Sequence, residues 1–229
     1  MKKNKPMALY KIIQQQGFGT RAYCQAMIEA GEVTVRGELC DDPDALFDLD
    51  DLSFTIQGQA WDYAPFVYVL LHKPAGYECS QKPKFHKGIL SLLPANLRAR
   101  DVQPVGRLDV DTTGLLLLSD DGQFIHKNIS PKKNVNKVYH ATCAEPITDD
   151  FIAQLKTGVL LKDEDETIAA VDARALSERV LELTLSEGKY HQVKRMVVAA
   201  GNHVTQLHRI SVGEYVLPED LAVGEWRLI

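Results

Sequence analysis

Apolar residues recur with a helical period near the start of the chain. Residues 8–16 and 21–30 both carry apolar positions three to four residues apart, which predicts two short amphipathic helices. Thr20 precedes the second segment as a candidate N-cap, and Gly31 follows it as a stop signal. The chain is therefore expected to begin with a helical pair.

After these helices the pattern changes to the period of two that is typical of strands. Strands are predicted over residues 33–35, 38–40 and 52–57, with a hairpin turn at Arg36-Gly37 between the first two. The acidic residues 41–51 are predicted to form a loop within this small module.

Longer apolar segments begin at residue 66 and predict a second, larger domain. We expect an α+β fold with a first domain over residues 1–58, a linker over 59–65 and a second domain over 66–229. At about 160 residues, the second domain is large enough to bury a substantial core. Its predicted elements are strands over 66–71, 115–118, 137–143, 203–209 and 226–229, strands broken by an acidic turn over 159–185, and helices over 122–128, 149–156 and 190–200.

The composition is that of a soluble globular protein. No apolar segment approaches the length of a membrane span, and the lysine-rich start lacks the apolar run of a signal peptide. The four cysteines are scattered and form no Cys-x-x-Cys pair, so neither a zinc site nor a disulfide framework is indicated. These features favour a location in a reducing cytoplasm.

Charge is segregated along the chain, although the net charge is −5. Residues 1–40 and 67–140 carry +3 and +5, whereas residues 41–66 and 145–182 carry −7 and −6. The two basic blocks could follow a phosphate backbone, and an ordinary solvated surface is the alternative interpretation.

A short polar loop precedes the most apolar segment of the chain. Residues 106–114 read GRLDVDTTG and run directly into Leu115–Leu118, which are predicted to form a strand buried on both faces. A loop anchored on such a strand is well placed for chemistry, because the scaffold fixes its geometry. The alternative is a polar turn whose side chains bond their own backbone. A calcium loop is excluded, because the leucines fall where ligands should lie.

This loop closely resembles the active-site signature of the pseudouridine synthases, in the form found in the RsuA branch, which modifies ribosomal RNA. The matching residues are Gly106-Arg107-Leu108-Asp109 followed by Asp111-Thr112-Thr113-Gly114. The resemblance implies that Asp109 is the catalytic aspartate, and it places Arg107 and Thr113 among the substrate-binding residues.

Two further segments are similar to motifs of the same family. His72-Lys73-Pro74-Ala75-Gly76 resembles its first motif, with His72 replacing the usual Asn, and implies a substrate-binding role for Lys73. Lys137-Val138-Tyr139 matches a Lys-x-Tyr motif whose tyrosine lies against the target base. A tyrosine suits that task because its ring stacks on uracil and its hydroxyl can handle a proton.

The stretch EGKYHQVKRM, residues 187–196, is similar to the third motif of the family. The resemblance implies that Lys194 pairs with Asp109, and Arg195 is the alternative partner, because spacing alone leaves both possible. His191 and Gln192, in the first turn of the predicted helix, are expected to contact the substrate.

The first domain resembles the S4-like (alpha-L) RNA-binding module, through residues 19–40 with the sequence GTRAYCQAMIEAGEVTVRGELC. The resemblance implies that Arg21 contacts RNA, and a solvated surface residue is the alternative. Residues 80–87 interleave lysines with Phe85, a composition that suits splayed RNA or an ordinary solvent loop.

The family resemblance implies site-specific isomerisation of a uridine to pseudouridine in 16S ribosomal RNA, most specifically uridine-516. The alternatives are a synthase of the same branch that acts on 23S ribosomal RNA, and a non-catalytic protein of RNA binding or ribosome assembly. The expected partner is 16S ribosomal RNA or a small-subunit assembly intermediate, without a membrane. No cofactor and no metal are expected, and the protein is expected to be a monomer.

Overall fold

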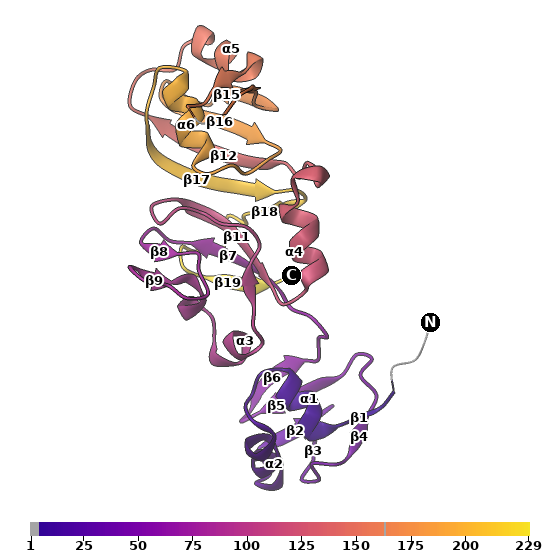
Figure 1. Cartoon of the computed structure of the whole chain (residues 1–229). Helices are drawn as coiled ribbons and strands as arrows, with labels where there is room; N and C mark the ends of the chain where they lie inside the picture. The colour runs from indigo at the N-terminus through magenta and orange to yellow at the C-terminus, as the bar shows by residue number, and fades with distance from the viewer. Residues whose placement is uncertain (1–4, 163) are drawn as a thin grey trace. The chain divides into compact units, whose positions relative to one another are not determined.

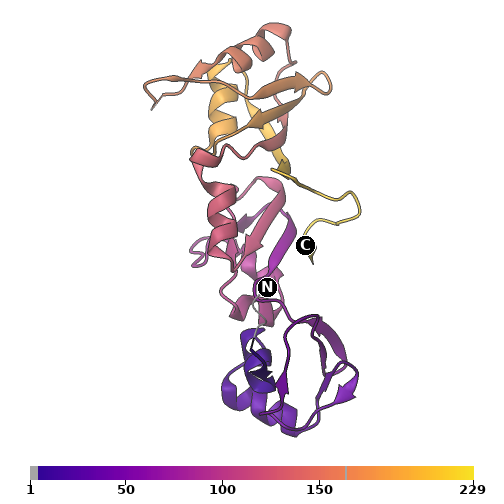
Figure 2. The same ribbon diagram turned by 90° about the vertical axis from the view of Figure 1, so that its right-hand side faces the viewer.

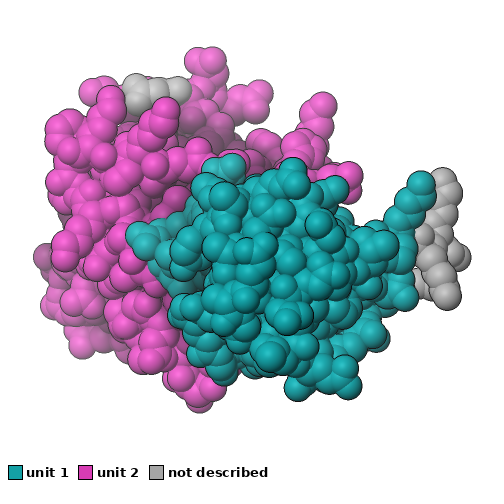
Figure 3. Space-filling model, turned by 90° about the horizontal axis from the view of Figure 1, so that it is seen from below, with its two compact units in different colours: residues 1–67, 93–102 teal, residues 68–92, 103–229 magenta. Residues whose placement is uncertain are grey.

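The computed structural model describes residues 5–162 and 164–229, which form two compact units (Figure 3). Unit 1 contains the chain up to residue 67 together with residues 93–102, and unit 2 contains residues 68–92 and 103–229.

Unit 1 packs two helices against a small antiparallel sheet and has its own apolar core (Figure 1). Thr20 caps the second helix, since its hydroxyl accepts a hydrogen bond from Tyr23 N at 3.3 Å, as predicted. Arg36 and Gly37 both have positive φ angles, 50° and 86°, as the predicted tight hairpin requires. The elements are β1 (Met7–Ala8) paired with β4 (Leu46–Phe47), α1 (Leu9–Gln15), α2 (Arg21–Glu29), and the sheet β3 (Glu38–Leu39), β2 (Val33–Val35), β5 (Ser53–Ile56) and β6 (Gln59–Asp62), in that order.

The predicted linker is in part a strand. Residues 59–62 form β6, which pairs antiparallel with β5, and Trp61 packs against the core of the unit. Gln57 and Gly58 make the turn between these strands, both with positive φ. The sequence does not reveal this hairpin, because Gly58 and Pro65 are also typical limits of an irregular segment.

Residues 93–102, predicted to lie in the second domain, cluster with unit 1. The guanidinium of Arg100 donates to Gln16 Oε1 at 2.7 Å and to the carbonyl of Ala64 at 3.1 Å. The backbone of Asn96 in α3 (Ala95–Ala99) approaches Gly17 so closely that a Cβ there would collide with its carbonyl. These partners lie between 36 and 84 positions apart, so no local pattern reveals them.

Unit 2 is built on a mixed sheet in which every pairing is antiparallel except that of β11 with β17. This confirms the predicted mainly antiparallel sheet. The strand order along the sheet is β15 (Asp172–Ala175), β16 (Val180–Leu185), β12 (Lys137–Cys143), β17 (Val204–Val212), β11 (Thr113–Ser119), β7 (Tyr68–Lys73) and β19 (Trp226–Leu228), with β10 (Gln103–Pro104) paired to β11 and β18 (Tyr215–Val216) to β17.

Strand β11 is the core of this sheet, and the side chains of Leu115–Leu118 are fully buried, as predicted. An extended segment, yellow in Figure 2, returns the chain from β18 to β19, which pairs with β7. The remaining elements are β8 (Tyr77–Glu78) paired with β9 (Lys87–Gly88), β13 (Val159–Leu160) paired with β14 (Thr167–Ile168), the short helices η1 (Ile89–Leu92) and η2 (Pro131–Lys133), and the helices α4 (Gly122–Ile129), α5 (Asp149–Thr157) and α6 (Gln192–Ala199).

Candidate active site

The polar loop with Asp109 joins β10 to β11, and the side chain of Lys73 donates hydrogen bonds to its backbone. Lys73 is fully buried, and its ammonium donates to the carbonyls of Pro74 at 3.0 Å, Val110 at 3.2 Å and Thr112 at 2.8 Å. Burial lowers the pKa of Lys73 from its ordinary value. The structure does not place Lys73 at the pocket where the predicted substrate contact would lie, because its ammonium is directed at backbone carbonyls, two of which belong to the loop.

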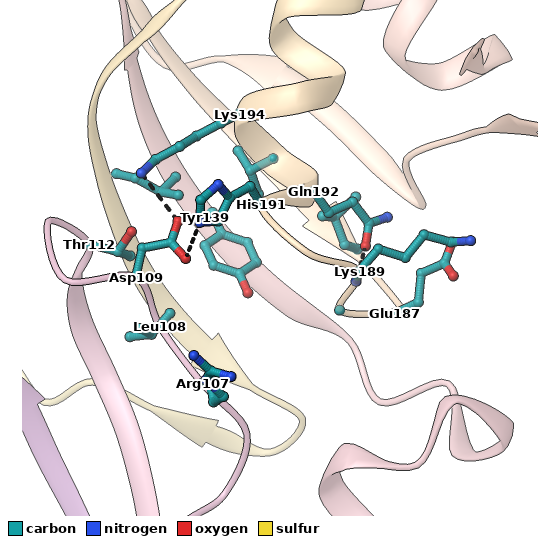
Figure 4. Close-up of a pocket in the computed structure, with 14 residues that line it drawn as sticks. Arg107, Leu108, Asp109, Thr112, Tyr139, Glu187, Lys189, His191, Gln192 and Lys194 are labelled. Carbon is teal, nitrogen blue, oxygen red and sulfur yellow. Dashed lines mark hydrogen bonds and ion pairs between the residues drawn. The ribbon is translucent and has the colours of Figure 1, made fainter. Parts of the chain in front are cut away.

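Two basic side chains converge on the carboxylate of Asp109 (Figure 4). Lys194 Nζ lies 3.2 Å from Asp109 Oδ2, and His191 Nε2 lies 3.1 Å from Asp109 Oδ1. Asp109 belongs to the loop before β11, whereas both partners come from the start of α6. The sheet and this helix thus bring together residues about eighty positions apart.

Lys194 bridges two carboxylates of the same loop. Its Nζ also lies 2.7 Å from Asp111 Oδ1 and 2.9 Å from Asp111 Oδ2. Burial disfavours the ammonium, but its hydrogen bonds to Asp111 and Asp109 outweigh that cost and raise the pKa of Lys194 above its ordinary value. The hydrogen bond from Lys194 lowers the pKa of Asp111. Asp111 was not among the predicted site residues, although its place two residues after Asp109 put it on the same loop.

The helix α6 starts at Gln192, so His191 is the residue before it and not part of its first turn. The backbone of His191 has the left-handed conformation, with φ 48°, which is uncommon outside glycine and is found among residues of functional sites. This conformation turns the imidazole away from the helix and toward Asp109. The helical periodicity of residues 190–200 could not reveal it.

Tyr139 stands beside this cluster on β12, with its side chain largely buried. The same pocket is lined by Arg107, Asp109, Thr112 and Lys194 (Figure 4). Leu185 of β16 and Leu207 of β17 supply apolar walls. A planar base could enter between such walls and meet the tyrosine ring, a carboxylate and a cation together.

The two adjacent threonines of the loop have different surroundings. Thr113, predicted to bind substrate, directs its hydroxyl to His208 Nδ1 at 2.8 Å and does not line the pocket. Thr112 lines the pocket, and within the described residues its buried hydroxyl has no hydrogen-bond partner. The sequence does not distinguish two neighbouring threonines, and the structure places Thr112 rather than Thr113 at the pocket.

Of the other predicted site residues, two line the pocket and two do not. Arg107 is exposed at the pocket, and Gln192 lines it while its side-chain oxygen accepts from Lys189 N at 2.8 Å. Arg195 donates to the carbonyl of Tyr190 at 3.2 Å and lies 4.0 Å from Glu164, so Lys194 and not Arg195 is the partner of Asp109. Arg21 belongs to unit 1.

Residues 5–162 and 164–229 contain no group of three histidine, cysteine or acidic side chains arranged to hold a metal ion. No helix in those ranges is both long enough and apolar enough to cross a membrane.

Known proteins match this chain along most of its length. A family model described as RNA pseudouridylate synthase matches residues 67–199. The chain is 39% identical to ribosomal small subunit pseudouridine synthase A of Escherichia coli, with 96% of this chain and 95% of the relative covered. It is 36% identical to an uncharacterized RNA pseudouridine synthase of Bacillus subtilis, with 96% and 94% covered.

A solved structure extends the match to the fold. The crystal structure of a pseudouridylate synthase shares 35% sequence identity, covers 97% of this chain and 96% of its own, and superposes with a TM-score of 0.69. The family model includes both Asp109 and Lys194, the residues that the fold brings into contact. The chain therefore belongs to the RNA pseudouridine synthases and, within them, to the RsuA-type family.

Proposed function

We propose that this enzyme converts one uridine of 16S ribosomal RNA, uridine-516 in particular, to pseudouridine, with Asp109 as the catalytic residue. The contact of Asp109 with Lys194 and His191, beside Tyr139 in one pocket, is the observation that carries the proposal. The choice of small-subunit RNA rests on the name of the Escherichia coli relative, a ribosomal small subunit pseudouridine synthase.

The isomerisation needs a carboxylate and a pocket that can receive the flipped base, and Asp109 and the pocket beside Tyr139 provide them. The uridine leaves its stack at a cost of roughly a few kcal/mol and enters the pocket. The bond from C1′ to N1 then breaks, the released uracil turns, and a bond from C1′ to C5 forms, while C5 loses its proton and N1 gains one. Asp109 acts on the sugar, either by attack on C1′ or by removal of a sugar proton.

The neighbouring residues supply the remaining requirements. Lys194 orients the carboxylate of Asp109 through the 3.2 Å contact. The ring of Tyr139 stacks on the uracil, and its hydroxyl is the group for the last proton transfer. Arg107 at the pocket binds the RNA backbone, and the unpaired hydroxyl of Thr112 is available to the nucleotide.

The N-terminal part serves as an S4-like RNA-binding module in this proposal, with Arg21 as an RNA contact. The functional boundaries are residues 1–58 for this module and 66–229 for the catalytic domain. The partner is 16S ribosomal RNA or an assembly intermediate of the small subunit, in the cytoplasm, and the enzyme acts as a monomer.

The Asp109→Asn variant tests the proposal. It keeps the size of the side chain and loses the carboxylate, so we expect a folded protein that releases no tritium from 16S ribosomal RNA labelled at C5 of uridine. The wild type should release tritium from this RNA and not from 23S RNA. Appreciable product from Asp109→Asn would contradict the role of the carboxylate, and release from 23S RNA alone would contradict the target.

A further inference from the structure

A second cavity adjoins the active-site pocket and contains mostly basic polar groups. It shares Arg107, Tyr139, Glu187 and Lys189 with that pocket, so the two cavities lie next to each other at the tyrosine. Its volume of about 200 Å³ is many times the space that one water molecule needs. The basic side chains that line it are Arg107, Lys137, Lys189 and Arg209, and Glu187 is the acidic one.

Arg209 is the most unusual of these groups, because it is a buried cation without a carboxylate partner in the described part of the chain. The residue is only 3% exposed, and its Nε donates to the carbonyl of Leu115 at 2.8 Å. Its Nη2 has no hydrogen-bond partner among the described residues. A buried charged donor left unpaired is costly, so a ligand acceptor is expected to complete it.

Strand register fixes Arg209 and Lys137 on the side of the sheet that carries Tyr139. Tyr139 on β12 is directly opposite Arg209 on β17, which places both side chains on one face as close neighbours. Lys137 precedes Tyr139 by two residues on the same strand and therefore shares its face. Tyr139 therefore has Arg209 beside it on the neighbouring strand and Lys137 beside it on its own strand.

Lys137 resembles Arg209 in its surroundings. Its Nζ donates to the carbonyl of Val135 at 2.7 Å and lies 3.5 Å from that of Ser186, and no carboxylate among the described residues forms an ion pair with it. Burial, and then the charge of Arg209, lower the pKa of Lys137. Lys189 differs, because it is paired with Glu164 at 2.6 Å. The cavity therefore carries an excess of positive charge, which an incoming anion would balance.

We propose that this cavity is an anion subsite in which Lys137 and Arg209 bind the phosphodiester next to the target uridine, with Arg107 at its entrance. The inference rests on the proposed function, since that RNA supplies the phosphate. A flipped nucleotide in the active-site pocket keeps its two flanking phosphates within a few ångströms of the sugar, and the cavity lies next to Tyr139, where the uracil stacks. Charge-assisted hydrogen bonds to one phosphate would anchor the sugar while the uracil detaches and turns.

A single uncharged linkage in the RNA tests this subsite. The full-length Asp109→Asn protein is titrated with a 16S fragment that contains the target, and with the same fragment carrying a methylphosphonate on the 5′ or the 3′ side of that uridine. We expect one of the two neutral linkages to weaken binding about tenfold. With Lys137→Gln added, the same linkage should weaken binding less than about threefold, because the interaction is already lost.

Two further variants keep the result interpretable. Lys156→Gln removes a lysine of α5 that pairs with Asp172 at 2.8 Å, and it should keep the full sensitivity to the neutral linkage. Arg209→Lys keeps the buried cation and loses Nη2, and it should reduce the sensitivity in part if its unfolding curve matches that of the parent.

The outcomes separate the subsite from the proposed function. Equal sensitivity to the neutral linkages with and without Lys137 would overturn the subsite, even if the wild type makes pseudouridine. A lower kcat of Lys137→Gln with unchanged linkage sensitivity would also overturn it, because it would indicate an action on the detached uracil. Failure of the wild type to release tritium from any small-subunit RNA would contradict the proposed function itself.

Discussion

Lys194 connects α6 to two carboxylates, Asp109 and Asp111, of the loop between β10 and β11. Its Nζ lies 3.2 Å from Asp109 and 2.7 Å from Asp111, so a single ammonium orients both carboxylates of the loop. Two carboxylates face one ammonium, so positive charge does not balance negative charge in this group of three. His191 makes a second contact to Asp109, at 3.1 Å. The ammonium stays protonated well into the alkaline range, since its pKa is raised.

Replacement of Lys194 should therefore affect the reaction far more than replacement of its neighbour. We expect Lys194→Met to lower kcat by about a hundredfold or more, because Asp109 loses its partner and its orientation. Lys194→Arg should stay within about tenfold of the wild type, since the charge is kept, although the contact geometry changes. Single-turnover tritium release on 16S RNA measures both.

Arg195→Met is the matched control on the same helix turn. Arg195 contacts the carbonyl of Tyr190 and lies near Glu164, so its loss leaves the contacts of Asp109 in place. A larger loss of kcat in Arg195→Met than in Lys194→Met would contradict the pairing that the structure shows.

At the scale of elements, the junction of β11 and β17 positions the site. Among the described residues of the nine-stranded sheet of unit 2 it is the one parallel pairing, and the loop that carries Asp109 enters it at Gly114. Gly114 has φ 101° and is paired in register with Arg209. A Cβ at this position would lie 2.6 Å from Arg209 N and in closer conflict with its carbonyl, so the strands could not approach.

The Gly114→Ala variant should consequently be severely destabilised. We expect its free energy of unfolding to fall by roughly 3 kcal/mol or more, from backbone strain and from the clash with β17. Gly122→Ala is the control, because Gly122 is the first residue of α4 and a Cβ there meets open space. That variant should be neutral or more stable by up to about 1 kcal/mol. Urea unfolding of both variants measures these free energies. A Gly114→Ala protein as stable as the wild type would refute the close packing of β11 and β17.

Predictions from the sequence succeeded where the signal is local. The fully apolar stretch of β11, the alternation of β12 and the cap of α2 by Thr20 all follow from neighbours in the sequence, and the structure confirms them. Asp109 and Lys194 were paired by family resemblance, because no periodicity links residues so far apart.

The failures share one physical cause, which is that burial and long-range contact are decided by the folded chain. Lys73 looks like a surface cation in the sequence, yet its ammonium donates to the carbonyl of its neighbour Pro74 and to two carbonyls of a distant loop. Thr112 and Thr113 differ only in the direction each side chain takes at the start of β11. The left-handed backbone of His191 interrupts a pattern that reads as continuous helix.

For the whole molecule, the net charge of −5 conceals basic regions in both units. In unit 1 the guanidinium of Arg21 lies over the ring of Tyr10, 4.7 Å from its centroid, and the residue is exposed at the start of α2. This cation–π contact restricts the side chain before any ligand arrives, so little conformational freedom is lost on binding a phosphate. An RNA contact made here adds affinity without a part in the chemistry of unit 2.

Arg21→Gln should accordingly raise the KM for 16S RNA several-fold and leave kcat unchanged. Loss of one phosphate contact should also reduce the slope of log KM against log salt concentration by about one.

Arg36→Gln removes the same charge from the hairpin turn between β2 and β3 and should leave both quantities as in the wild type. If both variants raised the KM for 16S RNA equally, unit 1 would attract RNA through the summed charge of its arginines and not through a contact specific to Arg21. If Arg21→Gln changed kcat as well, the contact would be needed for placement of the uridine beside Asp109, and the separation of binding from chemistry between the two units would be refuted.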